Sequence, residues 1–193
     1  MVQREENCHI ISRHSTNLDR YMEYLEENCA NVYSNKMNHR THTRKYVGVV
    51  LKIDKFLYYV PMSSPKNSDY QIAGEKFVIK KSIVPIIRMI HRNSKKEKEL
   101  LGTLRISHMI PVPESEITLY DIDNEIDERY KDLIMNELSF IRENETKIIK
   151  NATVMYKQKM EAADIGYVKS ALPFHQIEQL CLKFEEENQK EIP

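Results

Sequence analysis

Hydrophobic positions along the chain follow two different periods, and the change between them divides the sequence. Short runs rich in β-branched and aromatic residues occupy positions 46–53, 56–62, 76–79, 86–90 and 101–106. Such runs predict β-strands, and the two residues between the first two runs predict a hairpin turn. Weaker runs at 9–11 and 117–119 predict two more short strands. We therefore expect a compact, strongly twisted antiparallel sheet or a small barrel.

The segments on either side of this region have helical spacing. Apolar residues between positions 18 and 25 recur every three or four residues, which predicts an amphipathic helix that ends near residue 29. From residue 123 onward, apolar residues mark one face of a long helix, with Asn144 or Asn151 as the place of an interruption. Pro173 can open a last helix. The fold class is α+β in one domain, 1–193, with a sheet at about 35–122 and helices at about 123–193.

Composition narrows the class of protein. The chain has 193 residues, of which 41% are hydrophobic and 30% charged, so it can bury a core. No stretch approaches the length of a membrane span, and residues 1–8 are too polar for a signal peptide. The three cysteines are scattered without a paired motif, which fits a reducing compartment. We expect a cytoplasmic protein with no membrane partner.

Motifs of the common cofactor and metal enzymes are missing. The four glycines are too dispersed for a phosphate-binding loop, and no HExxH or GxSxG motif occurs. His39 and His42 lie three positions apart, but in a polar segment they are better explained as solvated side chains. We expect no metal site and no cofactor.

Charge is distributed unevenly although the chain is neutral overall. From residue 35 to residue 105 there are 16 Lys or Arg and five Asp or Glu, a net charge of +11. The remaining sequence therefore carries −11. This asymmetry points to an anionic partner for the basic region. The alternative is that the two regions solvate their own surfaces and neutralise each other.

One loop combines groups that could bind a phosphate. Ser63 and Ser64 follow a predicted strand and can donate hydrogen bonds, while Lys66 supplies a positive charge. Pro65 between them limits the motion of the turn. Taken alone, the same residues also suit an ordinary turn.

An ordered set of segments resembles the ToxN/AbiQ family, the endoribonuclease toxins of type III toxin–antitoxin and phage-abortive systems. The segments are YVGVVL at 46–51, YYVPMSSPK at 58–66, LGTLRISHMIPVP at 101–113, ITLYDI at 117–122 and LSFIREN at 138–144. A lone SSPK would be a weak match, whereas their common order and spacing cover most of the chain. The resemblance implies a Kid/MazF-like antiparallel sheet with added helices.

The same resemblance implies an activity and its partners. Members cleave RNA without a metal ion and leave a 2′,3′-cyclic phosphate and a 5′-hydroxyl. Their antitoxin is a small repetitive RNA that folds as a pseudoknot, joins the toxin in a closed ring and is cut from its precursor by the toxin. We therefore expect cellular or phage RNA as substrate and no dedicated protein partner.

Functional residues of the family carry over to specific positions of this chain. Ser64 matches the catalytic hydroxyl, with Ser63 beside it, and Lys66 matches the family lysine. Tyr33 is the candidate for a functional tyrosine and Arg44, or Lys45, for a functional base before the first central strand. In such cleavage the RNA 2′-oxygen is the nucleophile, so these groups would position the phosphate and offset its charge.

The general base stays open at this point, because an unperturbed lysine or tyrosine is a poor base at neutral pH. His91 titrates in a better range, but nothing in the sequence brings it close to Ser64.

Basic and aromatic residues of the central region are the candidates for an RNA-binding groove. They are Lys36, Arg40, Lys45, Tyr46, Lys76, Lys80, Lys81, Arg88, Lys95 and Lys96. Tyr33, Tyr46 and Tyr59 could stack bases, although tyrosines in strands can equally be core residues. Two other classes remain open: a non-catalytic RNA-binding module, and an adaptor whose acidic helices bind a protein partner.

Overall fold

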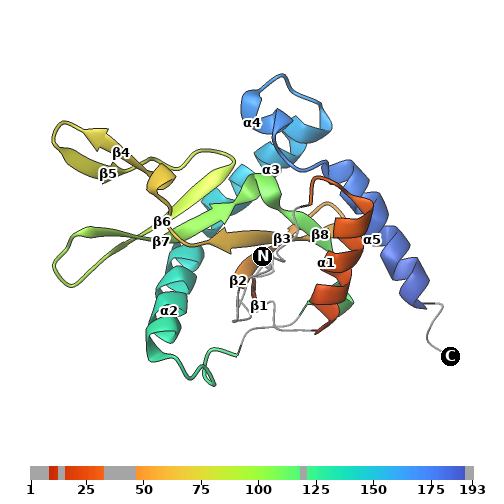
Figure 1. Ribbon diagram of the computed structural model, residues 1–193, viewed down its shortest axis with the longest axis horizontal. Coiled ribbons are helices and arrows are strands. Elements are labelled where there is room, and N and C mark those ends of the chain that lie inside the picture. Colours follow the sequence, from red (N-terminus) through yellow and green to blue (C-terminus); the bar gives the residue numbers. More distant parts are fainter. Residues whose placement is uncertain (1–8, 13–15, 33–46, 118–120, 190–193) are drawn as a thin grey trace, which may run out of the picture.

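The computed structural model describes residues 9–12, 16–32, 47–117 and 121–189 (Figure 1). It is an α+β fold in which one curled antiparallel sheet carries helices on its surface, as the sequence predicts. Strand order in this sheet is β1-β2-β3-β7-β6, and β8 also pairs with β3. The strands are β1 (His9–Ser12), β2 (Val47–Ile53), β3 (Phe56–Ser63), β6 (Ile86–Arg92), β7 (Lys98–Arg105) and β8 (Ile110–Val112).

Strand β3 curls the sheet because it pairs with two strands along the same edge. Its first half lies opposite β8, with Leu57 facing Val112, and its last two residues lie opposite β7, with Ser63 facing Thr103. Its other edge pairs with β2 over its first six residues. The end of β3 therefore lies where the two halves of the sheet meet. The loop with the sequence SSPK, residues 63–66, starts there and is called the SSPK loop below.

The predicted β2–β3 hairpin is confirmed. Its turn places Asp54 in the left-handed region, with φ of 54°. Within the hairpin, the Tyr59 ring lies so close over Gly48 that a Cβ there would be 2.0 Å from a ring carbon. The Tyr59 ring therefore leaves no space for a side chain at position 48. Tyr59 is buried in the core, so of the two roles that the sequence leaves open for it, base stacking or core packing, the structure supports core packing.

A separate two-stranded sheet follows the SSPK loop. It consists of β4 (Tyr70–Ala73) and β5 (Lys76–Ile79), which come after the short 3₁₀ helix η1 (Asn67–Asp69). The hairpin stands away from the rest of the molecule in Figure 1. The sequence predicts β5 at these bounds but not β4.

The helices follow the predicted pattern. The predicted interruption falls at Asn144, between α2 and α3, and the last helix begins directly after Pro173. Asp127 caps α2 by accepting hydrogen bonds from the backbone amides of Arg129 and Tyr130. The helices are α1 (Thr16–Asn28), α2 (Glu128–Glu143), α3 (Glu145–Met160), α4 (Gly166–Lys169) and α5 (Phe174–Gln189), with η2 (Ile106–His108) and η3 (Glu114–Glu116) between strands and helices.

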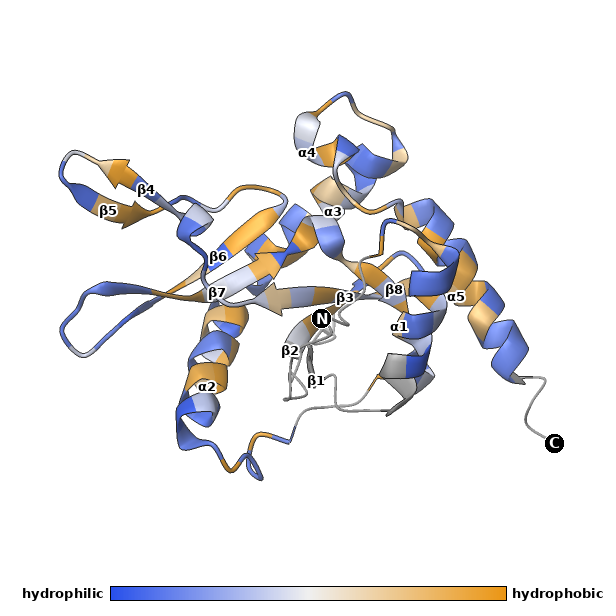
Figure 2. Ribbon diagram, viewed as in Figure 1, coloured by the Kyte–Doolittle hydropathy of each residue, from blue (hydrophilic) through white to orange (hydrophobic). Residues whose placement is uncertain are grey.

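Apolar residues of these helices and of the sheet form one buried core, and the helix ribbons in Figure 2 alternate between hydrophobic and hydrophilic residues. Helix α2 packs on β6 and β7, and α5 packs on β8 and α1. Tyr21 of α1 donates a hydrogen bond to the Pro111 carbonyl at 2.8 Å and meets the Phe184 ring edge-on. The helical regions before and after the sheet are thereby joined into one core.

The strand at residues 110–112 is absent from the sequence prediction, since a proline at its centre is unfavourable in most strands. Pro111 lies within β8, opposite Tyr58. A proline is tolerated where a strand needs no amide on its outer edge. Of the strand predicted at 117–119, Ile117 lies outside any strand, and residues 118 and 119 lie outside the described ranges.

Candidate functional site

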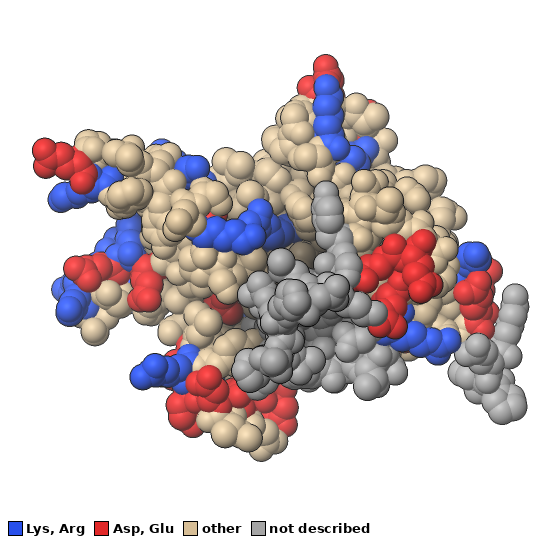
Figure 3. All heavy atoms as spheres, in the orientation of Figure 1, with Lys and Arg blue, Asp and Glu red and all other residues tan. Residues whose placement is uncertain are grey.

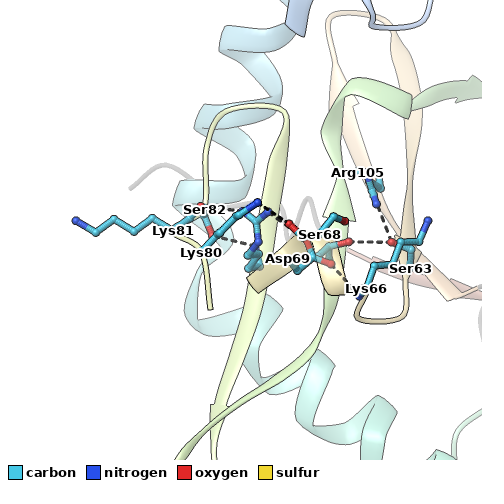
Figure 4. A network of polar contacts seen from close by, with 10 residues as sticks. Ser63, Lys66, Ser68, Asp69, Lys80, Lys81, Ser82 and Arg105 are labelled. Carbon is cyan, nitrogen blue, oxygen red and sulfur yellow. Dashed lines mark hydrogen bonds and ion pairs between the residues drawn. The ribbon is translucent and has the colours of Figure 1, made fainter. Parts of the chain in front are cut away.

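The SSPK loop is fixed at its start by the sheet. Ser63 ends β3, and its hydroxyl lies 2.8 Å from the Thr103 hydroxyl of β7. Arg105, two residues further along β7, donates a hydrogen bond from Nε to the same Ser63 oxygen at 3.3 Å (Figure 4). The Ser63 side chain is therefore engaged within the protein, whereas Ser64 is exposed to solvent. Ser64 is thus the hydroxyl that an incoming ligand can reach.

A buried carboxylate fixes the other end of the loop. Asp69 accepts the backbone amide of Lys66 at 3.0 Å, and the Asp69 amide bonds the Lys66 carbonyl at 2.9 Å. Asp69 is only 2% exposed, and its second carboxylate oxygen lies 3.1 Å from the Arg88 guanidinium. The Lys66 side chain remains exposed. Both ends being anchored, Ser64 and Lys66 stand on a loop of defined shape.

The side chain of Arg88 has a structural role in the protein interior. It is 6% exposed, and besides Asp69 it donates a hydrogen bond from Nη1 to the Lys81 carbonyl at 2.8 Å. Its backbone amide donates to the Ser82 hydroxyl at 2.9 Å. A guanidinium that is buried and used in this way cannot also line a groove. The assignment of Arg88 to the RNA-binding residues is corrected accordingly.

Two residues that sequence reasoning missed lie beside the loop. Arg105 contacts Ser63 as described, and His108 follows in η2, with Nδ1 3.0 Å from the Ser107 hydroxyl. Burial lowers the pKa of His108 below its ordinary 6.5, and the positive charges of Arg105 and Lys66 lower it further. The imidazole is therefore neutral at neutral pH and can accept a proton. No periodicity in the sequence marks it; only the pairing of β3 with β7 brings it here.

The remaining predicted residues fall in three places. Lys76, Lys80 and Lys81 belong to the β4–β5 hairpin and the segment after it, and the Lys80 ammonium donates to the Ser68 carbonyl at 2.9 Å. Lys95 and Lys96 are exposed in the turn between β6 and β7. Six candidates lie outside the described residues: Tyr33, Lys36, Arg40, Arg44, Lys45 and Tyr46.

The surface keeps the division of charge seen in the sequence. Figure 3 shows basic side chains over the two projecting hairpins and the middle of the sheet, and acidic clusters over α1 and near the start of α2. Acidic side chains also occur on both hairpins, so basic side chains in this region are in excess but do not form an unbroken surface. His91, on β6 opposite Glu99, is half-buried and belongs to the hairpin end of the sheet.

Within the described ranges, no three His, Cys, Asp or Glu side chains lie close enough together to hold a metal ion. In the same part of the chain, no helix has the length and apolarity needed to cross a bilayer.

The family model for "Toxin ToxN, type III toxin-antitoxin system" matches residues 15–182. The chain belongs to this family, as its sequence segments predict.

Three curated relatives are similar over most of their length. Endoribonuclease ToxN of Bacillus thuringiensis subsp. kurstaki is 27% identical, and the match covers 88% of this chain and 82% of the relative. Endoribonuclease ToxN of Pectobacterium atrosepticum is 30% identical over 67% and 70%, respectively. Endoribonuclease AbiQ of Lactococcus lactis subsp. lactis is 28% identical over 86% and 85%.

Solved structures agree with the fold. A structure from work on selective toxin inhibition by a non-coding RNA pseudoknot superposes with a TM-score of 0.67 and 25% identity, covering 94% of this chain and 99% of that one. The structure of AbiQ, a lactococcal anti-phage endoribonuclease, gives a TM-score of 0.69 at 18% identity over 93% and 99%. At that identity the second likeness supports the fold alone.

Proposed function

We propose that this protein is an endoribonuclease toxin that cleaves RNA without a metal ion and is inhibited by a small pseudoknot RNA. The relatives named endoribonucleases support the activity. The observation that carries the proposal is the anchored loop, which presents the Ser64 hydroxyl and the Lys66 ammonium to solvent beside Arg105 and a neutral histidine. These are the groups that phosphate chemistry on RNA requires.

In the proposed reaction the RNA supplies its own nucleophile. The ribose 2′-oxygen forms a bond to the adjacent phosphorus, and the bond from phosphorus to the 5′-oxygen breaks. The products are a 2′,3′-cyclic phosphate and a 5′-hydroxyl. The enzyme has to align these atoms, accept one proton, supply another and offset the charge that builds on the phosphate oxygens.

The roles of the loop residues follow from their exposure. Ser64 donates a hydrogen bond to a non-bridging phosphate oxygen, and Lys66 supplies a point charge next to it. Ser63 and Arg105 hold one another through the 3.3 Å hydrogen bond. We assign the remaining guanidinium donors of Arg105 to the phosphate, while its Nε bond to Ser63 holds the residue directly before Ser64.

His108 is the group best suited to accept the 2′-hydroxyl proton. Its pKa lies below 6.5 because of burial and the two nearby cations, so the base form is present at neutral pH. Lysine and tyrosine lack this property unless their pKa is strongly lowered. When the Nδ1 proton is donated to Ser107, Nε2 is free to act as the base.

RNA is also the partner in this proposal. One related structure comes from work on toxin inhibition by an RNA pseudoknot, and another from work on a processed non-coding RNA that regulates an antiviral system. By analogy, repeats of a small pseudoknot RNA would bind the basic surface, assemble with the toxin into a closed ring and be released from their precursor by the same loop. Cellular or phage RNA would be the toxic target.

The experiment compares two exposed serines of the same loop region, Ser64 and Ser68. Ser64→Ala is expected to reduce the rate of RNA cleavage about 10² to 10³-fold, because one charge-stabilising donor is lost. Ser68→Ala, the matched control, should cleave at nearly the wild-type rate. Wild-type cleavage by Ser64→Ala would refute the assignment. Wild-type protein that binds RNA and leaves it intact would favour a non-catalytic RNA-binding module.

A further inference from the structure

The hairpin that follows the loop exposes two large apolar side chains. Ile72 of β4 is 72% exposed and Phe77 of β5 is 77% exposed. They lie directly opposite each other in the strand register. Large apolar side chains paired in this way on an uncovered ribbon mark a contact surface rather than a core.

The exposed pair belongs to one continuous face. Tyr70 pairs with Ile79 two positions closer to the body of the protein. Because side chains two residues apart share a face of a strand, Tyr70, Ile72, Phe77 and Ile79 all lie on the same side of the ribbon. The opposite side carries Gln71, Ala73 and Lys76, with Val78 as its one larger apolar residue. We call the first side the apolar hairpin face.

The base of this hairpin is attached to the SSPK loop. The Lys80 amide donates to the Asp69 carbonyl at 2.9 Å, and the Lys80 ammonium donates to the Ser68 carbonyl at 2.9 Å. Asp69 in turn binds both the Lys66 amide and Arg88. Figure 4 shows these contacts as a network that runs from Lys66 through Asp69 and Arg88 to Lys81. The hairpin is therefore an arm held in a fixed position relative to Ser64.

The charge of this arm favours an anionic occupant. Residues 70–81 contain three lysines and one glutamate, a net charge of +2. An apolar surface next to positive charges complements a strand that has both flat bases and phosphates. Unpaired nucleobases stack on aromatic side chains regardless of sequence, and lysines track the backbone between them.

We propose that the apolar hairpin face is a stacking platform for unpaired bases of the RNA that flanks the cleaved phosphate. Phe77 stacks on a base, Ile72 and Tyr70 extend the surface toward the loop, and Lys81, which is exposed just beyond the hairpin, contacts the backbone. The inference rests on the proposed function and adds the part of the RNA that this hairpin binds. It makes single-stranded RNA beside the cleavage position a requirement for tight binding.

The test measures binding of a fluorescently labelled, unstructured single-stranded RNA over a range of salt concentrations. The parent protein carries Ser64→Ala, and each further substitution is added to it. Phe77→Ala is expected to weaken binding about tenfold or more, the effect of losing one stacked base. The slope of log affinity against log salt should stay unchanged, since no charge is lost. Lys81→Gln should instead lower that slope by about 0.7.

Two controls isolate stacking. Phe77→Trp should restore the affinity, because it keeps an aromatic face. Gln71→Ala, exposed on the opposite side of the ribbon, should bind like the parent protein.

Each contrary result has a distinct meaning. Parent protein that binds no RNA would overturn the proposed function, and this inference with it. Parent protein that binds RNA, together with Phe77→Ala binding equally well, would overturn the stacking platform alone. If Phe77→Ala instead changed the oligomeric state without RNA, measured by light scattering, the face would be a contact between protein copies and the inference would be wrong.

Discussion

The buried carboxyl group of Glu137 makes the stability of the protein depend on pH. This carboxylate is on α2, is 7% exposed and lies against β7. A Cβ at position 102 would be 3.0 Å from its Oε1, so Gly102 leaves the space that the carboxylate fills. Burial raises the pKa of Glu137 from 4.5 to about 7. The neutral acid is thus the form that the folded protein prefers.

The sign and size of the effect on stability follow from that shift. In the unfolded chain the carboxyl loses its proton near pH 4.5, whereas in the folded protein it loses it near pH 7. The stability that the neutral form contributes is complete below pH 4.5 and is lost as the pH rises through 7. A shift of about 2.5 pKa units corresponds to about 3 kcal/mol of unfolding free energy above pH 7.

Glu137→Gln removes the ionisation while keeping the shape of the side chain. Urea unfolding should find the variant more stable than wild type by about 3 kcal/mol at pH 8.5 and by about 1 kcal/mol at pH 5. Glu143→Gln, an exposed carboxylate on the same helix, is the control and should change stability by less than about 0.5 kcal/mol at both values. A difference for Glu137→Gln that is the same at pH 5 and pH 8.5 would refute the reasoning.

Three further predictions concern the loop, the base and the core. Asp69→Ala leaves Arg88 buried without its carboxylate partner and should lower the unfolding free energy by about 3–5 kcal/mol in urea; wild-type stability would contradict the role of this pair. The cleavage rate of the wild type should rise with pH through a midpoint below 6.5, and His108→Ala should remove that rise and lower the plateau about 10²-fold. An unchanged profile would exclude His108 as the base. The Tyr58 and Tyr156 hydroxyls both donate to Oε1 of buried Glu178, so Glu178→Ala should cost about 3 kcal/mol in thermal unfolding. A melting temperature equal to wild type would contradict this.

Much of the fold could be predicted from hydrophobic period together with local turn and helix-start signals. The β2–β3 hairpin, the interruption at Asn144 and the start of α5 after Pro173 all follow local rules of spacing and capping. Strand β8 could not be predicted in this way, because Pro111 is acceptable only once its edge position is known. Strand β4 alternates too weakly over its four residues to stand out from the loop before it.

The residues of the candidate site likewise include some that the sequence predicts and some that only the structure reveals. Ser63, Ser64 and Lys66 are neighbours in sequence, so their association needs no tertiary information. Arg105 and His108 join them only because Ser63 lies opposite Thr103 in the sheet, and this register cannot be read from the chain. Charge alone also cannot separate a buried, paired guanidinium from an exposed one, which explains the error at Arg88.

The central claim concerns the chemistry of cleavage, and the RNA ends produced in EDTA test it most directly. Purified protein would be incubated with RNA in excess chelator, and the fragment ends would be identified by mass spectrometry. The proposed mechanism predicts that RNA is cleaved at the same rate with and without chelator. The fragments should carry 2′,3′-cyclic phosphate and 5′-hydroxyl ends. Fragments with 3′-hydroxyl and 5′-phosphate ends, or cleavage that stops in EDTA and returns with added Mg²⁺, would contradict it.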